Sequence, residues 1–425
     1  KNPMPQQRMG AATATTSSTR TRSPASIIFL IQLMLSSTIR RSSSAAAFTF
    51  STSTTRLRAA ASLSGGKSNF CSSKPTATTF PAIAQYNNKS INRVRTIMSE
   101  SLSASVNGDM INGDNINSYE FTEDERYLFD TFGYLVIRNV LTKEEVAEAN
   151  AVLDKHMHKV EERMDTALRN TKEGTPLSGD GKRGRMDLGG VLEWPGDDSR
   201  VFKSILAHPK LVKKFHGLLG KGYRMDHMPF VIAQEKGSEG FSLHGGTVDC
   251  SSGEYNPFLA YSCNHGKLHN ALLGVSVQFA DADSGDGGFI VVPGSHKSNF
   301  KMPQSMIDGE EYTEFIRQPV TKAGDVVLFS EGTVHGAAAW NAEHQRRICL
   351  YRFSPATNCY GRSYFGSEGR TWPEAMYNDL DEAQRSVLEP PYANRLDRPN
   401  IEDDGSVVLT TRNSKKKEFD RPNIE

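Results

Sequence analysis

The sequence predicts an α+β domain in which helices come first and many short strands then close into a barrel or sandwich. Up to about residue 220, apolar residues recur at helical spacing. From Tyr223 onward the apolar segments become short and rich in β-branched residues, and Gly, Pro or Asp bound each of them. Helices followed by a run of strands are typical of the α+β class.

The first hundred residues differ from that domain in composition. Between Lys1 and Ser99 there are 13 Lys and Arg residues and no Asp or Glu. An apolar segment at 27–35 lies between arginines and small residues, as in a signal peptide, and the segment after Phe48 is rich in Ser, Thr and Arg, as in a transit peptide. We expect residues 1–115 to be a disordered targeting leader for a plastid, with the mitochondrion or cytoplasm as alternatives.

Charge and cysteine content exclude several classes of protein. The remaining chain has all 49 acidic residues and 37 basic ones, a net charge of about −12, which argues against a nucleic-acid-binding domain. Five cysteines without C-x-x-C spacing argue against a disulfide framework or a thiolate zinc site. Because no run of 18 apolar residues occurs, we expect no membrane span in the mature protein.

Two capping boxes mark the first helices of the domain. Thr122 is followed three residues later by Glu125, and Thr142 by Glu145, so each Ser/Thr-x-x-Glu pair is placed to satisfy the free N–H groups of a first turn. Helices are expected within the segments 121–133, 141–164, 198–220 and 371–392.

The strands alternate with turn residues over the second half of the domain. We expect them within the segments 134–140, 223–234, 270–282, 287–296, 324–332 and 346–355. The folded domain is therefore expected to span residues 116–395, with residues 396–425 as a polar tail.

Two histidines have the placement expected of metal ligands from distant strands. His244 lies in "GFSLHGGTVDC" and His335 in "LFSEGTVHGAAAW", and each is expected to end a short strand. Neutral imidazole is a ligand for iron, zinc, copper and nickel alike, so the histidines do not select the metal. For either histidine alone, a structural role at a strand end is the simpler explanation.

Two arginines begin the strand that follows His335. Arg346 and Arg347 open "RRICLYRF", eleven residues after that histidine. A guanidinium inside a small barrel requires a carboxylate partner, and bidentate pairing with a carboxylate is the interaction that Arg forms best. The alternative for either residue is a place on the surface.

Taken together, these segments resemble the phytanoyl-CoA dioxygenase-like family of Fe(II)- and 2-oxoglutarate-dependent oxygenases. The resemblance rests on "FDTFGYLVIRNVLTKEEVAEANAVLD", "LHGG", "DGGFIVVPGSHKSNF" and "AGDVVLFSEGTVHGAAAWNAEHQRRICLYRFSP", in this order. It extends over about residues 120–395. The order of the whole set makes it specific, whereas "PGSHK" alone would be a weak signal.

The resemblance implies a double-stranded β-helix (a jelly roll, cupin-like) as the core, with flanking helices. It implies that His244 and His335 are the catalytic iron ligands, and that Arg346, or else Arg347, binds the far carboxylate of 2-oxoglutarate. The implied cofactors are Fe(II), 2-oxoglutarate as cosubstrate and O2. The simplest implied reaction is hydroxylation of a small or medium organic metabolite; no basic cluster suggests a site for the phosphates of CoA.

The acid of the family's usual His-x-Asp motif is missing, because residue 246 is Gly. Such sites normally combine two histidines with one carboxylate. We consider three alternatives. Asp249 swings in as the third metal ligand, which we prefer; water or a halide takes the position; or another segment supplies the acid, with Asp226, Asp286 and Glu254 as candidates.

Two other functions stay open at the level of sequence. The same chemistry with a bound halide would give halogenation, and a jelly roll without a complete metal site would bind a ligand without catalysis. In each case the expected partner is a small molecule, and nothing in the sequence indicates the oligomeric state.

Overall fold

The computed structural model describes residues 119–164, 169–361, 372–391 and 398–410. The leader predicted for residues 1–115 lies outside them. Within the described residues the chain is of mixed α and β structure, as the sequence predicted, and its sheets are antiparallel. None of the described helices is both long and apolar enough to cross a membrane.

The larger sheet has seven strands, and all of its neighbouring strands are antiparallel. Their order across the sheet is β1-β10-β8-β12-β4-β3-β2. In chain order the strands are β1 (Tyr134–Ile137), β2 (Glu161–Arg163), β3 (Arg185–Leu188), β4 (Arg224–Gln234), β8 (Leu273–Gln278), β10 (Val326–Ser330) and β12 (Arg346–Ser354).

A smaller sheet of three antiparallel strands has the order β5-β11-β9. Two separate hairpins complete the β structure, β6 with β7 and β13 with β14. The bounds of these strands are β5 (Phe241–His244), β6 (Tyr261–Asn264), β7 (Lys267–Asn270), β9 (Gly288–Val291), β11 (His335–Ala338), β13 (Arg398–Ile401) and β14 (Val407–Thr410).

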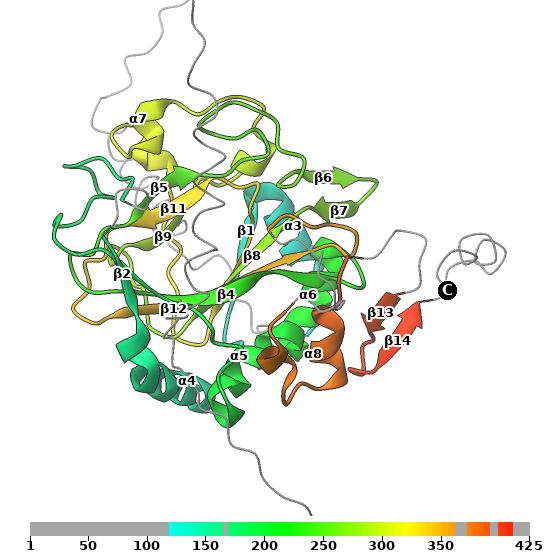
Figure 1. The fold of residues 1–425 in the computed structure, drawn as a ribbon. Coiled ribbons are helices and arrows are strands. Elements are labelled where there is room, and N and C mark those ends of the chain that lie inside the picture. Colours follow the sequence, from blue (N-terminus) through cyan, green and yellow to red (C-terminus); the bar gives the residue numbers. More distant parts are fainter. Residues whose placement is uncertain (1–118, 165–168, 362–371, 392–397, 411–425) are drawn as a thin grey trace, which may run out of the picture. The chain divides into compact units, whose positions relative to one another are not determined.

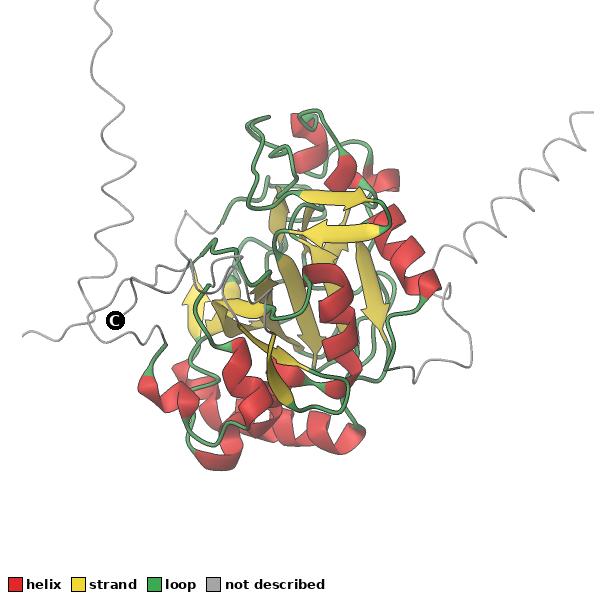
Figure 2. Cartoon of the chain, turned by 90° about the vertical axis from the view of Figure 1, so that its right-hand side faces the viewer, coloured by secondary structure: helices red, strands yellow, loops and turns green. Residues whose placement is uncertain are grey.

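Helices cover one side of the larger sheet. The α-helices are α3 (Glu123–Phe132), α4 (Lys143–His156), α5 (Arg200–Ser204), α6 (Pro209–Leu219), α7 (Gln304–Ile307) and α8 (Glu382–Val387). Figure 1 shows α4, α5, α6 and α8 on one side of the long strands β4 and β12, with β5, β9 and β11 on the other side. Figure 2 shows the same structure turned by 90°, with one group of helices below the strands and other helices beside and above them.

The main hydrophobic core lies between the larger sheet and these helices. Phe215 of α6 packs on Phe353 of β12 with ring centroids 4.9 Å apart, and Phe202 of α5 meets Phe279 just beyond β8 at 5.6 Å. All four rings are buried. Burial of a large apolar side chain contributes roughly 1.5–3 kcal/mol to the stability of the fold. These contacts therefore help to hold the helices on the larger sheet.

The two predicted capping boxes are confirmed, because Thr122 and Thr142 each exchange hydrogen bonds with the Glu three residues on. The helix predicted within 141–164 ends earlier, at His156. The following residues form a short 3-10 turn and then β2, which pairs with β3. The apolar spacing that predicted this helix ends at Leu153.

The C-terminal predictions need two corrections. The single helix expected within 371–392 is instead a 3-10 turn at Glu374–Tyr377 and the short α8, which a new capping box at Asp381 begins. The tail expected from residue 396 contains the hairpin β13–β14, whose Ile401 is buried. Asp404 and Gly405, followed by a β-branched segment, are the turn signal that would have predicted the hairpin.

His296 makes the stability of the fold depend on pH. Its side chain is fully buried, its Nε2 lies 3.0 Å from the carbonyl oxygen of Asp130, and burial lowers its pKa from 6.5 to about 4. Between these two values the unfolded chain binds more protons than the folded chain. The stabilisation is therefore fully present above pH 6.5 and is lost as the pH falls toward 4.

We expect the change His296→Gln to weaken this pH dependence. The loss of unfolding free energy between pH 7 and pH 5 should be smaller in the variant than in the unchanged protein by about 2 kcal/mol. Urea denaturation of the metal-free protein at both pH values measures it. Equal losses in the two proteins would show that His296 is not the group responsible.

Candidate metal and cosubstrate site

The two predicted histidines lie directly opposite one another on neighbouring strands. In the antiparallel pairing of β5 with β11, His335 is the register partner of His244, and their ring centroids are 4.3 Å apart. His244 ends β5 as predicted, whereas His335 begins β11 rather than ending a strand. The fold thus brings together two imidazoles from segments about ninety residues apart in the sequence.

Backbone carbonyls orient both rings. Nδ1 of His244 lies 3.0 Å from the carbonyl oxygen of Ser242, and Nδ1 of His335 lies 2.8 Å from that of Thr333. Since a carbonyl only accepts hydrogen bonds, Nδ1 carries the proton in each neutral ring and donates it. The lone pair of Nε2 is then available for a metal, as in histidine ligands whose other nitrogen is held by a carbonyl.

Burial keeps both imidazoles neutral at physiological pH. Burial and, to a smaller extent, the neighbouring His335 lower the pKa of His244 to about 3. Burial also lowers the pKa of His335, although Glu331 opposes this shift. A metal ion therefore meets two rings that have no proton to release from Nε2, which favours binding.

Arg346 is a buried cation without an acidic partner among the described residues. Its side chain is only 5% exposed, and Nη1 donates to Oε1 of Gln234, its register partner on β4. The guanidinium packs against the backbone of Gly288 on β9, where a Cβ would lie 2.8 Å from Nε. Burial lowers the pKa of Arg346 to about 9, and Arg185 adds to the effect. Such an arrangement is suited to an anionic ligand.

Arg185 adds a second guanidinium on the same part of the larger sheet. It lies on β3, pairs bidentately with Asp187 at 2.8 Å, and stands over the ring of Phe241 at 5.6 Å. The Phe241 ring in turn lies 5.0 Å from the ring of His244. Sequence reasoning did not single out Arg185, because nothing in its neighbourhood along the chain indicates which strand would lie beside Arg346.

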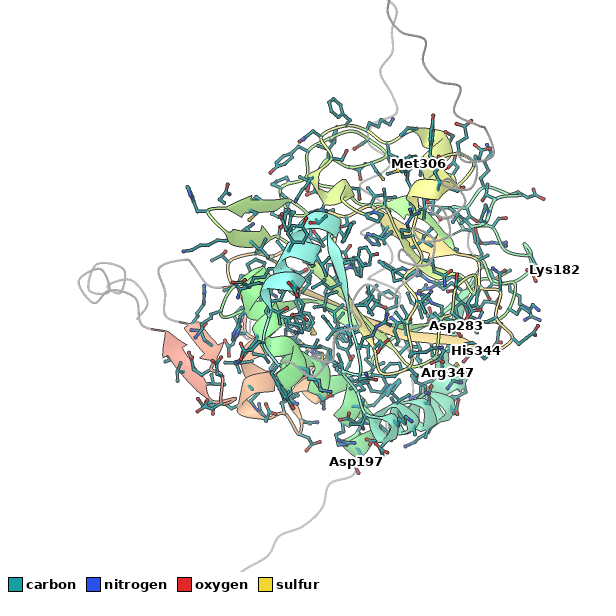
Figure 3. All side chains as sticks on the ribbon, turned by 180° about the vertical axis from the view of Figure 1, so that it is seen from behind. Lys182, Asp197, Asp283, Met306, His344 and Arg347 are labelled. Carbon is teal, nitrogen blue, oxygen red and sulfur yellow. The ribbon has the colours of Figure 1, made fainter. Side chains whose placement is uncertain are left out.

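Arg347 points to the other face of the larger sheet. Its guanidinium donates to Asn150 at 3.1 Å and to Asp154 of α4 at 2.6 Å. Figure 3 shows Arg347 near this helix. Consecutive residues of a strand point to opposite faces, so only one of the two arginines can enter the site. Arg346 lies on the face toward β9, and Arg347 binds α4 on the other face.

The carboxylate of Asp249 takes part in a turn. Its Oδ1 accepts hydrogen bonds from the N–H groups of Ser251, at 3.1 Å, and Ser252, at 2.6 Å. Asp249 forms no ion pair with either imidazole in the part of the chain that the structure describes. Its role as the third ligand stays a prediction.

The three other acids considered from the sequence are also occupied elsewhere or exposed. Asp226 accepts hydrogen bonds from Arg224 and from the N–H groups of Tyr360 and Gly361. Asp286 closes its own turn, and Glu254 is exposed. In the described ranges no three His, Cys, Asp or Glu side chains are already arranged to hold a metal.

One acid that sequence reasoning missed does lie beside the imidazole pair. Glu331 follows β10, is 5% exposed, and its Oε2 lies 3.7 Å from Nε2 of His335. Its Oε1 accepts a 2.6 Å hydrogen bond from Nε of Arg352 on β12. Burial alone would raise the pKa of Glu331, but Arg352 and His335 outweigh it and bring the pKa to about 2. In the sequence, the hint that Glu331 could belong to the site was its position four residues before His335.

The backbone at Gly246 explains why the usual acid is missing there. Gly245 and Gly246 have φ of +90° and +107°, in the region that side chains disfavour. A Cβ at residue 246 would lie 2.4 Å from the carbonyl oxygen of Val248. An Asp at this position would therefore clash with the turn that follows His244, and this backbone conformation favours glycine.

The change Gly246→Ala should destabilise the protein more than the matched change Gly285→Ala. Both add a Cβ at positive φ, +107° and +93°, but a Cβ at residue 285 would have no heavy atom within 4 Å beyond its own residue and the two adjacent ones. We expect a loss of roughly 1–2 kcal/mol of unfolding free energy at residue 285, and a further 1–3 kcal/mol at residue 246 from the clash. Chemical denaturation measures both, and equal losses would mean that the turn relaxes to accept a side chain.

Residues 129–348 match the phytanoyl-CoA dioxygenase (PhyH) family, and the chain belongs to this family. No curated protein matches the chain.

Several solved structures are similar to the chain at low identity. HygX from Streptomyces hygroscopicus, with nickel and 2-oxoglutarate bound, is 22% identical over 55% of this chain and 87% of its own, with a TM-score of 0.44. The epimerase SnoN from nogalamycin biosynthesis is 19% identical over 64% and 96%, with a TM-score of 0.40. EctD from S. alaskensis is 16% identical over 64% and 88%, with a TM-score of 0.41. At such values they carry no conclusion about this chain.

Proposed function

We propose that the protein is an Fe(II)- and 2-oxoglutarate-dependent oxygenase that hydroxylates a small or medium organic metabolite. The observation that carries this proposal is the Arg346 guanidinium, buried without an acidic partner among the described residues, in a fold that also pairs two neutral imidazoles. Membership in the phytanoyl-CoA dioxygenase family supports the same reaction class.

The residues present fit both groups. His244 and His335 would hold the iron through Nε2, since their Nδ1 atoms are engaged with carbonyls. Arg346 would bind the far carboxylate of 2-oxoglutarate, because its guanidinium packs against Gly288 of β9, and β9 pairs with the strand that carries His335. The two sheets would then be the two faces of a double-stranded β-helix.

Iron, 2-oxoglutarate and O2 together supply the oxidising chemistry when they are bound. The protein contributes binding, orientation and the exclusion of water. The ring of Phe329 lies 4.7 Å from that of His335, and Phe289 lies 4.9 Å from Phe329, so apolar groups flank the imidazole pair. In such surroundings the charge-assisted hydrogen bonds from Arg346 to a carboxylate are stronger than in water.

Two other functions remain as outcomes of the tests. A halide bound in place of an acid at residue 246 would give halogenation, and the small Gly246 is the residue that favours it. A protein that binds a ligand without catalysis would show neither iron binding nor turnover of 2-oxoglutarate.

Anaerobic titration with Fe(II) and 2-oxoglutarate tests the iron ligands. The unchanged protein should develop the weak visible absorption band of the iron–oxoacid chelate, and in air it should form succinate slowly. We expect His335→Ala to abolish both, because it removes one of two imidazole ligands. His158→Ala, at an exposed histidine, is the control and should retain both. Full succinate formation by the His335→Ala protein would defeat the assignment.

The arginine assignment has a matched pair of variants. We expect Arg346→Gln to raise the dissociation constant for 2-oxoglutarate about 10- to 100-fold, since a charge-assisted hydrogen bond contributes roughly 1.5–3 kcal/mol. The adjacent change Arg347→Gln should leave it unchanged, because that guanidinium is bound to α4. The same titration gives both constants, and weaker binding in the Arg347→Gln protein alone would reverse the assignment.

A further inference from the structure

The chain places a buried carboxylate beside the imidazole pair although residue 246 lacks one. Within the described ranges, Glu331 is the acid whose carboxylate lies within 4 Å of one of these rings. Its Oε2 approaches Nε2 of His335, which is the nitrogen left available by the hydrogen bond from Nδ1 to Thr333. The carboxylate therefore faces the side of the ring where a metal would bind.

The two oxygens of Glu331 have different surroundings. Oε1 accepts the hydrogen bond from Arg352, while no N–H or O–H group in the described part of the chain donates to Oε2. An acid that only served the ion pair with Arg352 would do best with both oxygens hydrogen-bonded. Oε2 thus has the free lone pairs that a cation requires.

The backbone brings Glu331 close to the turn that follows His244. The carbonyl oxygen of Glu331 lies 2.8 Å from the position that a Cβ on Gly245 would take. The Glu331 backbone therefore runs against Gly245, the first of the two glycines that follow His244. Because Gly245 has no side chain, the Glu331 segment can lie next to His244.

We propose that Glu331 is the third protein ligand of the metal held by His244 and His335. The inference rests on the proposed function, since it requires that these histidines bind a metal. Arg352 then orients the carboxylate through Oε1, as hydrogen-bonded partners commonly do for metal-binding carboxylates. At 3.7 Å from His335 the carboxylate is not yet in a ligand position, so metal binding draws Oε2 toward the imidazoles.

Cobalt(II) is a suitable probe, because its visible absorption reports the ligands and it does not depend on turnover. We expect Glu331→Gln to weaken Co(II) binding at least about tenfold and to change the absorption spectrum. The matched change Asp249→Asn should leave both as in the unchanged protein, since the Asp249 carboxylate is bound to a turn.

A double variant covers the case in which Glu331→Gln leaves Arg352 buried without a partner and fails to fold. Glu331→Gln combined with Arg352→Met removes both charges, and it should fold but bind Co(II) weakly. Arg352→Met alone keeps the carboxylate and should still bind the ion. A double variant that binds Co(II) like the unchanged protein would show that the ion pair is structural and would overturn the proposal.

Co(II) binding by these variants also distinguishes a failure of the Glu331 assignment from a failure of the proposed function. His335→Ala should lose Co(II) binding; if it does not, the imidazole pair is not the metal site and both proposals fail. If His335→Ala loses the ion but both Glu331 variants retain it unchanged, only the role of Glu331 is refuted. Weaker binding in Asp249→Asn in place of Glu331→Gln would assign the third ligand to Asp249.

Discussion

The pairing of β5 with β11 is the constraint on which the rest of the site depends. It sets His244 and His335 as register partners, so a shift of one residue would turn one of the rings to the other face of the smaller sheet. The Nδ1 hydrogen bonds go to carbonyls two residues earlier in each case, at Ser242 and Thr333. Ring position and ring orientation therefore both come from the backbone, and neither needs a partner side chain.

The second contribution comes from the larger sheet. Phe329 of β10 and Arg346 of β12 both reach the smaller sheet, at His335 and at Gly288 respectively. The helices on the opposite side bury the aromatic core behind these strands. A desolvated cation is unfavourable by itself, and its retention at Arg346 is understandable if an anion completes it.

Much of this arrangement could be predicted from the sequence because its signals are local. The capping boxes at Thr122 and Thr142 lie within four residues, and the glycines after His244 mark a turn. Which of Arg346 and Arg347 faces the smaller sheet depends on the phase of β12, and the contacts of Arg346 with Gly288 and of Arg347 with Asp154 show this phase.

What the sequence could not predict depends on contacts between distant segments. Glu331 becomes a candidate site residue only through its contacts in the fold. It lies next to His335, and Arg352 of β12 pairs with it. Arg185 lies far from Arg346 along the chain, and only the order of the strands makes them neighbours. The early end of α4 was missed because β2 forms by pairing with β3, a partner more than twenty residues away.

Because Arg346 and Arg347 point to opposite faces of the larger sheet, insertions and deletions between β11 and β12 are constrained. Residues 339–345 join the strand that carries His335 to the strand that begins with Arg346, and Trp340 anchors this connection through Nε1 to the carbonyl oxygen of His344. Replacing residues there keeps the phase of β12. A deletion of one residue that shifts the register of β12 by one would instead turn Arg347 to the face that Arg346 now occupies. The number of residues in this short connection therefore matters to the candidate site as much as the presence of Arg346.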